Sequence, residues 1–187
     1  LGLAIVKKLV ELMGGTVQLR STKGLGTEVK LHLSFTIVPE VQLQEEAQPE
    51  PLEVDFTGRR IMVVEDNAIN AEIVLRLLQK KGAAVVVAVD GANAVKQYAE
   101  AEQYFFDLVL MDVQMPVMDG LEATRRIRGL WRPDAKTVPI VAMTANAFAE
   151  DVASCKAAGM NAHVAKPINI QSFLATVGSQ LNRKNLP

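Results

Sequence analysis

The sequence predicts an α/β protein whose larger part is a doubly wound, five-stranded parallel sheet. Five apolar runs of strand length recur between residues 60 and 165, and helical patterns lie between them. Strands that alternate with helices are typical of a parallel sheet with helices packed on it. Four of the runs end abruptly in charged or hydroxyl residues, which puts polar chemistry at strand ends. A helix and a strand hairpin are expected in residues 1–37, before this domain.

Local patterns assign each element of the sheet domain. The predicted strands are the apolar runs Arg60–Val64, Ala83–Val89, Phe105–Met111, Val138–Met143 and Ala162–Ala165. The first helix is expected after Asn67 and ends at Gly82, with four side chains turned inward: Ile69, Ile73, Leu77 and Leu78. Further helices are expected near residues 91–102, 119–129, 147–158 and 169–182. Asp119 is expected to cap the second of these rather than to act in chemistry.

The strand ends carry the chemistry. Glu65 and Asp66 follow the first strand, Asp112 follows the third, Thr144 the fourth and Lys166 the fifth. Ligands bind at the carboxyl ends of the strands in open parallel sheets, so these side chains are expected to form one site. Carboxylate oxygens suit Mg²⁺, a hydroxyl can donate to a phosphoryl oxygen, and lysine supplies positive charge. Metal, positioning and charge neutralisation are what phosphoryl transfer needs.

Residues 59–183 resemble the receiver domain of two-component signalling proteins. The resemblance rests on the acid pair at 65–66, the run D-x-x-M-P-x-M-D-G at 112–120, and the pairs T-A at 144–145 and K-P at 166–167. All four come in the family's order and at its spacing. The resemblance implies a flavodoxin-like fold with strand order 2-1-3-4-5, numbered from the first strand of the domain.

The resemblance also implies roles for the residues of the site. Asp112 would be the phosphoacceptor, with Mg²⁺ held by Asp66, Asp112 and the backbone carbonyl of Gln114. Glu65 stands where the family often has Asp and would act through water. Thr144 would bind the phosphoryl group.

The fifth strand carries two further implied functions. Lys166 would pair with the phosphoryl group, and the Lys166–Pro167 peptide is expected to be cis, which costs X-Pro bonds only ~0.5–1 kcal/mol. His163 occupies a position where the family usually has Tyr or Phe, a side chain that acts with Thr144 as a switch. The sequence leaves two alternatives open for His163: the switch role, or a plain surface position.

Residues 1–37 resemble the C-terminal end of the ATP-binding catalytic domain of histidine kinases, an α/β sandwich. A helical pattern ends at Gly14-Gly15, and two alternating strands surround the turn at residues 24–26. The run 1–6 matches the second half of the family's G-x-G-L-G-L-A, and the run 21–27 matches its final G-x-G-T. The matching positions are the expected remnant of a nucleotide site: Gly2, Gly24, Gly26 and Thr27.

The larger part of a kinase core is not found in this sequence, including a helix with a phosphoaccepting histidine. ATP is therefore expected only in an intact parent histidine kinase, and this chain is not expected to phosphorylate itself from ATP. The chain does not begin with Met, so Leu1 is expected to lie inside a longer protein.

A connector is expected between the two parts. Residues 38–57 contain three prolines and six acids with no Lys or Arg, which favours an extended tether. The predicted domains are thus an ATPase fragment at 1–37, a linker at 38–57 and a receiver at 58–185.

Composition excludes several classes of protein. The apolar fraction of 49% is ordinary for a chain with a buried core, and the net charge of −1 gives no case for a nucleic-acid-binding surface. The single Cys155 fits a reducing compartment. No apolar stretch approaches the ~20 residues that span a bilayer. The segment is therefore expected to be cytoplasmic and free of membrane contact, in a parent that can itself be membrane-anchored.

The expected function is phosphoryl relay in a hybrid sensor histidine kinase. The expected partners are the kinase's dimerisation and phosphoacceptor domain and a histidine-phosphotransfer protein. One alternative is a non-catalytic interaction module in which the acids form only a charged loop. A nucleotide-binding α/β domain is disfavoured, because neither G-x-G-x-x-G nor G-x-x-x-x-G-K-[ST] follows any predicted strand.

Overall fold

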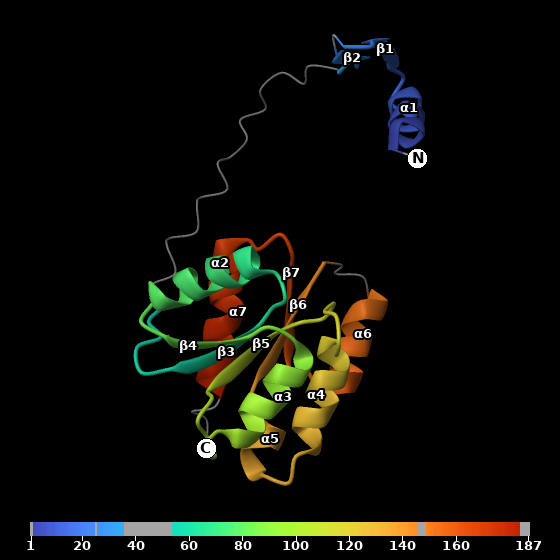
Figure 1. The fold of residues 1–187 in the computed structure, drawn as a ribbon. Coiled ribbons are helices and arrows are strands. Elements are labelled where there is room, and N and C mark those ends of the chain that lie inside the picture. The colour runs from blue at the N-terminus through green and yellow to red at the C-terminus, as the bar shows by residue number, and fades with distance from the viewer. Residues whose placement is uncertain (1, 25, 36–53, 146–148, 184–187) are drawn as a thin grey trace. The chain divides into compact units, whose positions relative to one another are not determined.

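A computed structural model describes residues 2–24, 26–35, 54–145 and 149–183 of the chain. The chain divides into two compact units, Leu1–Gln48 and Pro49–Pro187 (Figure 1). Several predictions lie outside the described residues: Leu1, Leu25, most of the connector, the start of the helix at 147–158, and residues 184–185. Among the described helices, none combines the length and the apolar character needed to cross a bilayer.

The second unit is built on a five-stranded parallel sheet in the order β4-β3-β5-β6-β7. The strands are β3 (Arg60–Val64), β4 (Ala84–Ala88), β5 (Leu108–Asp112), β6 (Ile140–Thr144) and β7 (Ala162–Ala165). Counted from β3, this is the order 2-1-3-4-5, so the predicted fold class is confirmed. Strand β3, the first of this sheet in sequence, lies between β4 and β5. The carboxyl ends of β3, β5, β6 and β7 lie along the same edge of the sheet.

Helices cover both faces of this sheet (Figure 1). They are α2 (Ala68–Gln79), α3 (Gly91–Glu100), α4 (Gly120–Gly129), α5 (Pro133–Thr137), α6 (Ala149–Ala158) and α7 (Ile170–Arg183). Helices α2 and α7 contribute to the core on one face, and α3, α4, α5 and α6 to the core on the other. The short α5 was not predicted.

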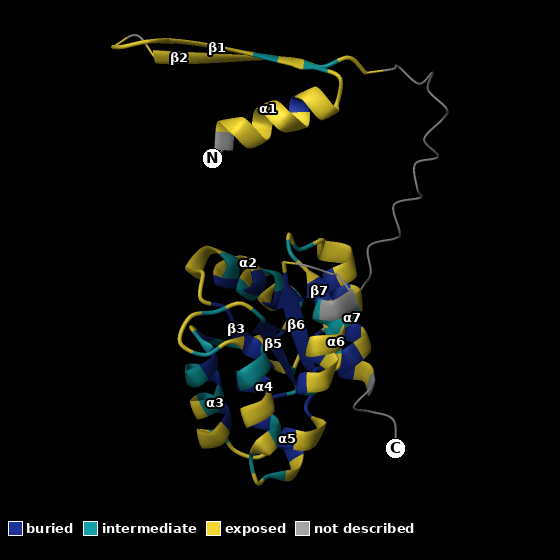
Figure 2. Cartoon of the chain, turned by 90° about the vertical axis from the view of Figure 1, so that its right-hand side faces the viewer, coloured by how far each residue is buried: buried dark blue, intermediate teal, exposed yellow. Residues whose placement is uncertain are grey.

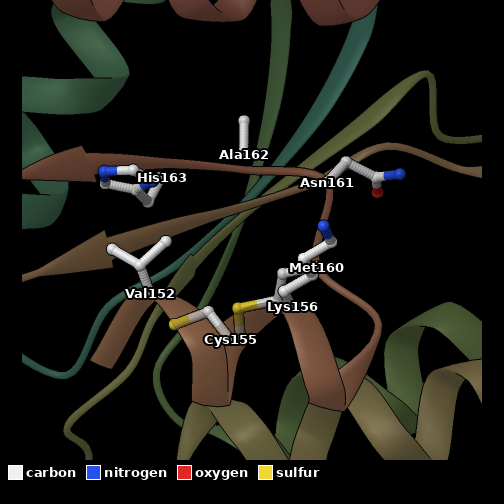
Figure 3. A pocket seen from close by; sticks show the side chains of 7 residues that line it. All are labelled: Val152, Cys155, Lys156, Met160, Asn161, Ala162 and His163. Atoms are coloured by element: carbon white, nitrogen blue, oxygen red, sulfur yellow. The ribbon is translucent and has the colours of Figure 1, made fainter. Parts of the chain in front are cut away.

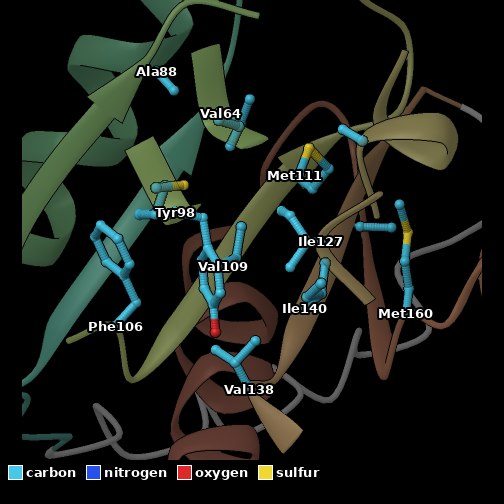
Figure 4. Close-up of a cluster of buried hydrophobic side chains, with 14 of the residues drawn as sticks. Val64, Ala88, Tyr98, Phe106, Val109, Met111, Ile127, Val138, Ile140 and Met160 are labelled. Carbon is cyan, nitrogen blue, oxygen red and sulfur yellow. The ribbon is translucent and has the colours of Figure 1, made fainter. Parts of the chain in front are cut away.

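Strand β3 shows how the sheet divides the core. Its side chains alternate between the faces, as strand geometry requires. Ile61 and Val63 belong to the cluster that contains α2 and α7 residues, whereas Met62 and Val64 belong to the cluster of α3, α4 and α6. Figure 4 shows the second cluster, and Figure 2 shows the buried strands between mostly exposed outer helix faces. Burial on both faces explains why the central strands β3, β5 and β6 are apolar runs.

The inward face of α2 differs from the predicted one. Val74 and Leu78 are buried, but Ile69 and Ile73 are 72% and 54% exposed. The predicted inward positions for these two isoleucines were therefore wrong. The buried stripe runs through Ala71, Val74 and Leu78, at helical spacing, which leaves Ile69 and Ile73 on a different side of the helix.

The packed part of the second unit begins earlier than the predicted boundary at residue 58. The Phe56 side chain is only 2% exposed and lies in the cluster with Val74 and Leu181. Its backbone N–H donates to the carbonyl of Lys81 at 2.7 Å. The end of the predicted connector is thus part of the core of the second unit, because the Phe56 side chain packs in the cluster that contains residues of α2 and α7.

Phe56→Ala should destabilise the second unit by about 3–5 kcal/mol, the usual cost of emptying a buried aromatic site. The urea midpoint of this unit, followed by far-UV circular dichroism, measures the loss. Phe35→Ala is the matched control, because Phe35 is 73% exposed and belongs to the other unit. An unchanged midpoint in Phe56→Ala would contradict the packing.

The first unit contains α1 (Gly2–Leu12) and an antiparallel hairpin of β1 (Thr16–Thr22) and β2 (Gly26–His32), as predicted. Gly15 is required where the helix meets the hairpin, because a Cβ there would lie 2.4 Å from the His32 carbonyl oxygen. Many large apolar side chains of this unit are exposed, such as Leu9 at 55% and Leu12 at 71%. A helix and two strands bury too little surface to cover them.

Candidate functional site

Three carboxylates meet at the carboxyl edge of the parallel sheet. Glu65 and Asp66 follow β3, and Asp112 is the last residue of the neighbouring β5. One ligand oxygen from each lies within 4.8 Å of the others. Glu65 and Asp112 are buried, and Asp66 is exposed. The sheet order explains the cluster, since β3 and β5 are adjacent although 43 residues separate Val64 from Leu108 in sequence.

Lys166 closes the cluster from the end of β7. Its Nζ donates to Glu65 Oε2 and to Asp112 Oδ2, both at 2.6 Å. The ammonium group is mostly buried, with 20% of the side chain exposed. The Lys166–Pro167 peptide is cis, as predicted. Two of the three ammonium donors are thus used within the cluster.

The environment shifts the pKa values of two of these groups. Burial raises the pKa of Asp112, and the nearby Glu65 adds to the rise, while Lys166 partly offsets both. Burial alone would lower the pKa of Lys166, but hydrogen bonds to Asp112 and Glu65 outweigh it and raise the pKa. Ionised Asp112 is therefore held at a free-energy cost that a cation or a donated proton would relieve.

The loop after Asp112 is built tightly around it. The Gln114 N–H donates to Asp112 Oδ1 at 3.2 Å. A Cβ at Gly120 would lie 2.0 Å from the Asp112 carbonyl oxygen, so only glycine fits at the start of α4. Asp119 caps α4 by accepting from the Glu122 N–H at 2.7 Å, which confirms its predicted capping role.

The remaining predicted residues of the sheet domain lie on β6 and β7. Thr144 ends β6, is 6% exposed, and its carbonyl accepts from the Lys166 N–H at 2.7 Å. The loop that carries Lys166 is therefore attached to Thr144. His163 is exposed and pairs in register with Ala142. It lines a cavity of about 390 Å³ between α6 and β7, together with Cys155 and Met160 (Figure 3).

The predicted nucleotide-site remnant lies in the first unit. Gly2 begins α1, and the other three residues surround the hairpin turn. Gly24 and Gly26 have φ angles of +83° and +106°, which favour glycine. The Thr27 hydroxyl lies 2.8 Å from that of Ser21.

Sequence patterns missed Asn70 as a residue of the site. It lies in the first turns of α2, and its Nδ2 donates to Glu65 Oε1 at 2.9 Å. Asn70, Ile73 and Lys166 also line a largely apolar cavity of about 290 Å³ with Pro167 and Ile168. The available signal was the helical spacing, because Asn70 is one turn from Asn67, the residue that caps α2 at the same edge of the sheet.

The arrangement combines a nucleophilic carboxylate with cation-binding and anion-binding groups. Together with Glu65 and Asp66, Asp112 supplies carboxylate oxygens, which are the ligands that Mg²⁺ prefers. The Lys166 ammonium lies beside the same carboxylate and can bind an anion brought to it. The site is therefore suited to transfer of an anionic group onto Asp112 with a divalent cation bound.

Comparison with known proteins identifies the class. Residues 61–178 match the response regulator receiver domain, and residues 1–37 match the histidine kinase-, DNA gyrase B- and HSP90-like ATPase family. The chain belongs to the response regulator receiver family. It joins a C-terminal ATPase fragment to a receiver, and its relatives are hybrid histidine kinases.

Two curated relatives share this order of parts. The virulence sensor protein BvgS of Bordetella bronchiseptica is 32% identical over 201 residues, which covers 100% of this chain and 15% of that protein. The autoinducer 2 sensor kinase/phosphatase LuxQ of Vibrio vulnificus is 34% identical over 173 residues, covering 92% of this chain and 20% of that protein. The chain thus spans a fifth or less of either relative.

A solved structure matches the second unit. It is the receiver domain of sensor histidine kinase PA1611 from Pseudomonas aeruginosa, with a magnesium ion coordinated in its active-site cleft. The two share 35% sequence identity and a TM-score of 0.60, and the match covers 67% of this chain and 99% of that chain.

Proposed function

We propose that this segment is the phosphoryl-accepting end of a hybrid sensor histidine kinase and that Asp112 receives the phosphoryl group from a phosphohistidine. The observation that carries the proposal is the pairing of Lys166 Nζ with Asp112 at 2.6 Å inside the three-carboxylate cluster. The curated relatives of the chain, which include a histidine kinase, a virulence sensor protein and a sensor kinase/phosphatase, support the same assignment. A charged loop without chemistry would not need a buried lysine held between two buried acids.

The proposed step uses residues of this chain in distinct roles. An Asp112 carboxylate oxygen attacks phosphorus and the P–N bond of the phosphohistidine breaks. The imidazole keeps the electron pair of that bond and leaves as a neutral ring, because its other nitrogen carries a proton. Lys166 turns from the carboxylate toward a phosphoryl oxygen. Thr144, at the end of the neighbouring β6, donates to another. The Thr144 carbonyl holds the Lys166 loop, so these two groups would shift together.

Mg²⁺ is the cation that the donor set fits, through Asp66, Asp112 and the Gln114 carbonyl, with Glu65 acting through water. When bound, the ion balances the negative charge of the carboxylates and of the incoming phosphoryl group. The PA1611 receiver, which carries magnesium in its cleft, supports this part of the proposal. ATP belongs to the intact parent kinase in this account.

The phosphohistidine donor is proposed to approach over α2 and the loop after β7. Ile69 and Ile73 are exposed there, and Pro167 and Ile168 line the cavity beside Lys166. A protein surface that covers these apolar groups would bring its imidazole close to Asp112, because Lys166 touches both the cavity and that carboxylate. The donor would be the kinase's own phosphoacceptor domain, and a histidine-phosphotransfer protein would receive the group afterwards.

The function is tested by incubating the chain with Mg²⁺ and a small acyl phosphate donor, then measuring the intact mass. The expected result is the gain of one base-labile phosphoryl group, which chelation of the metal prevents. If none of several donors modifies the chain in the presence of Mg²⁺, the alternative of a non-catalytic interaction module is favoured instead.

Asp66→Ala should weaken Mg²⁺ binding by roughly a factor of ten or more, because it removes a direct carboxylate ligand. Glu65→Ala should weaken binding less, since its contact is proposed to run through water. Calorimetric titration of Mg²⁺ into the wild type and the two variants gives the order of affinities. The stabilisation of the fold by saturating Mg²⁺ should follow the same order. Wild-type affinity in Asp66→Ala would show that the carboxylates are not the metal site.

A further inference from the structure

The geometry points to Asn70 as a positioning residue that fixes the Glu65 carboxylate during phosphoryl transfer. This inference rests on the proposed function of the site and adds a residue to it. Asn70 Nδ2 donates to Glu65 Oε1 at 2.9 Å, while Lys166 Nζ donates to Glu65 Oε2 at 2.6 Å. Each oxygen of Glu65 is therefore held by a different donor.

Phosphoryl transfer is expected to move Lys166 away from Glu65 but to leave Asn70 in place. Lys166 also pairs with Asp112, and it turns toward the phosphoryl group once that group arrives. Glu65 then loses the hydrogen bond on one oxygen. Asn70 remains, since it is anchored on α2 rather than on the loop after β7. The orientation of Glu65 in the phosphorylated state therefore depends on Asn70.

An amide suits this role because it is neutral. It donates a hydrogen bond to the carboxylate without cancelling its negative charge, so the charge of Glu65 stays available to attract the cation. The side chain of Glu65 is only 1% exposed, and a buried carboxylate oxygen without a donor would be costly. Hydrogen-bond partners of direct metal ligands typically change affinity by about 10–100-fold when removed. Asn70 acts one step further out, through the water-mediated Glu65, so its effect is expected to be smaller.

The pairing also depends on the length of the side chain at position 65. Glutamate extends one methylene further than aspartate, and Glu65 uses that length to reach an amide on the first turn of α2. An aspartate at the same position is expected to fall short of Asn70. Asn70 should therefore matter only when residue 65 is Glu.

A double-mutant cycle on the full chain tests this coupling. The variants are Asn70→Ala, Glu65→Asp and the double substitution, with Gln79→Ala as an exposed control on the same helix. Mg²⁺ affinity is measured by calorimetry, the phosphorylation rate with a small acyl phosphate donor, and the melting temperature in the presence of a chelator. Asn70→Ala is expected to weaken Mg²⁺ binding about two- to threefold, no more than Glu65→Ala does, and to slow phosphorylation. It should also lower the metal-free melting temperature, because it leaves the buried Glu65 Oε1 without its donor. In the Glu65→Asp background, the same substitution should have almost no effect.

Wild-type Mg²⁺ affinity in Asn70→Ala, or an equal loss in both backgrounds, would overturn the inference. A loss of metal-free stability without a change in affinity would also overturn it, since that is the signature of a purely structural hydrogen bond. Failure of the proposed function is a separate outcome. It would appear as a wild-type chain that gains no phosphoryl group, while the Mg²⁺ affinities of the cycle would still decide the role of Asn70.

Discussion

Asp112→Asn should abolish phosphoryl acceptance by the chain, because an amide oxygen is too poor a nucleophile to form the acyl phosphate. The same substitution should raise the melting temperature in metal-free buffer. Burial and the charge of Glu65 raise the pKa of Asp112 in the folded state, so its ionised form destabilises the fold at neutral pH. Removing that charge relieves the cost. Opposite changes in activity and stability are expected where residues are selected for chemistry rather than for stability.

The control for this substitution is Asp119→Asn. Asp119 lies seven residues later in the same loop and caps α4 through the Glu122 N–H. Asparagine is as good a cap as aspartate, so phosphorylation should continue. Intact-mass measurements and thermal melting on both variants decide the matter. Phosphorylation of Asp112→Asn at the wild-type level would mean that another residue accepts the group.

Arg132→Ala should destabilise the receiver unit by about 3–5 kcal/mol. Arg132 lies just before α5 and is not part of the acid cluster. Its guanidinium donates to both oxygens of Asp134 at 2.7 and 2.8 Å and to the carbonyls of Tyr98, Ala101 and Glu102 at the end of α3. Asp134 is 2% exposed. Loss of the arginine leaves a buried charge and several helix-end carbonyls without their donor.

This effect should depend on pH in a defined direction. Burial alone would raise the pKa of Asp134, but hydrogen bonds from Arg132, from the Tyr104 N–H and from Tyr98 outweigh it and lower the pKa from 3.8 to about 2. The stabilisation is therefore complete above the unfolded value of 3.8 and is lost as the pH falls toward 2. The stability difference between wild type and Arg132→Ala should shrink over the same range.

Urea unfolding at several pH values measures both the size and the pH dependence. Arg125→Ala is the matched control, because Arg125 pairs with Glu122 on the exposed side of α4 at 3.6 Å. Surface pairs contribute at most about 1 kcal/mol, so its midpoint should barely move. Equal losses in the two variants would contradict the structural role assigned to Arg132.

Much of the fold could be predicted because the three central strands, β3, β5 and β6, are buried on both faces and so appear as apolar runs. The inward face of α2 could not be predicted correctly, since Ile69 and Ile73 are as apolar as the side chains that reach the core. Only the rotation of the helix on the sheet separates them, and that depends on tertiary packing. Helix α5 was missed because its five residues are too short to show a helical period, although Pro133 at its start is a common helix signal.

The site was easier to predict than the helix faces. Glu65, Asp66, Asp112, Thr144 and Lys166 all stand at strand ends, and parallel strands bring their carboxyl ends to one edge. Glu65, Asp112 and Lys166 do meet there, as their contacts show. Asn70 was missed because it lies on a helix, where an amide usually faces solvent. Its contact depends on the reach of Glu65, which no local pattern encodes.

The most direct measurement is to map the phosphoryl group on the wild-type chain after reaction with a phosphorylated histidine-bearing kinase domain. Peptide mass spectrometry after trapping the acyl phosphate with a hydride or hydroxylamine reagent gives its position. The account predicts a single modified residue, Asp112, and no modification when the metal is chelated. Modification at any other residue, or equal labelling without a divalent cation, would contradict the account.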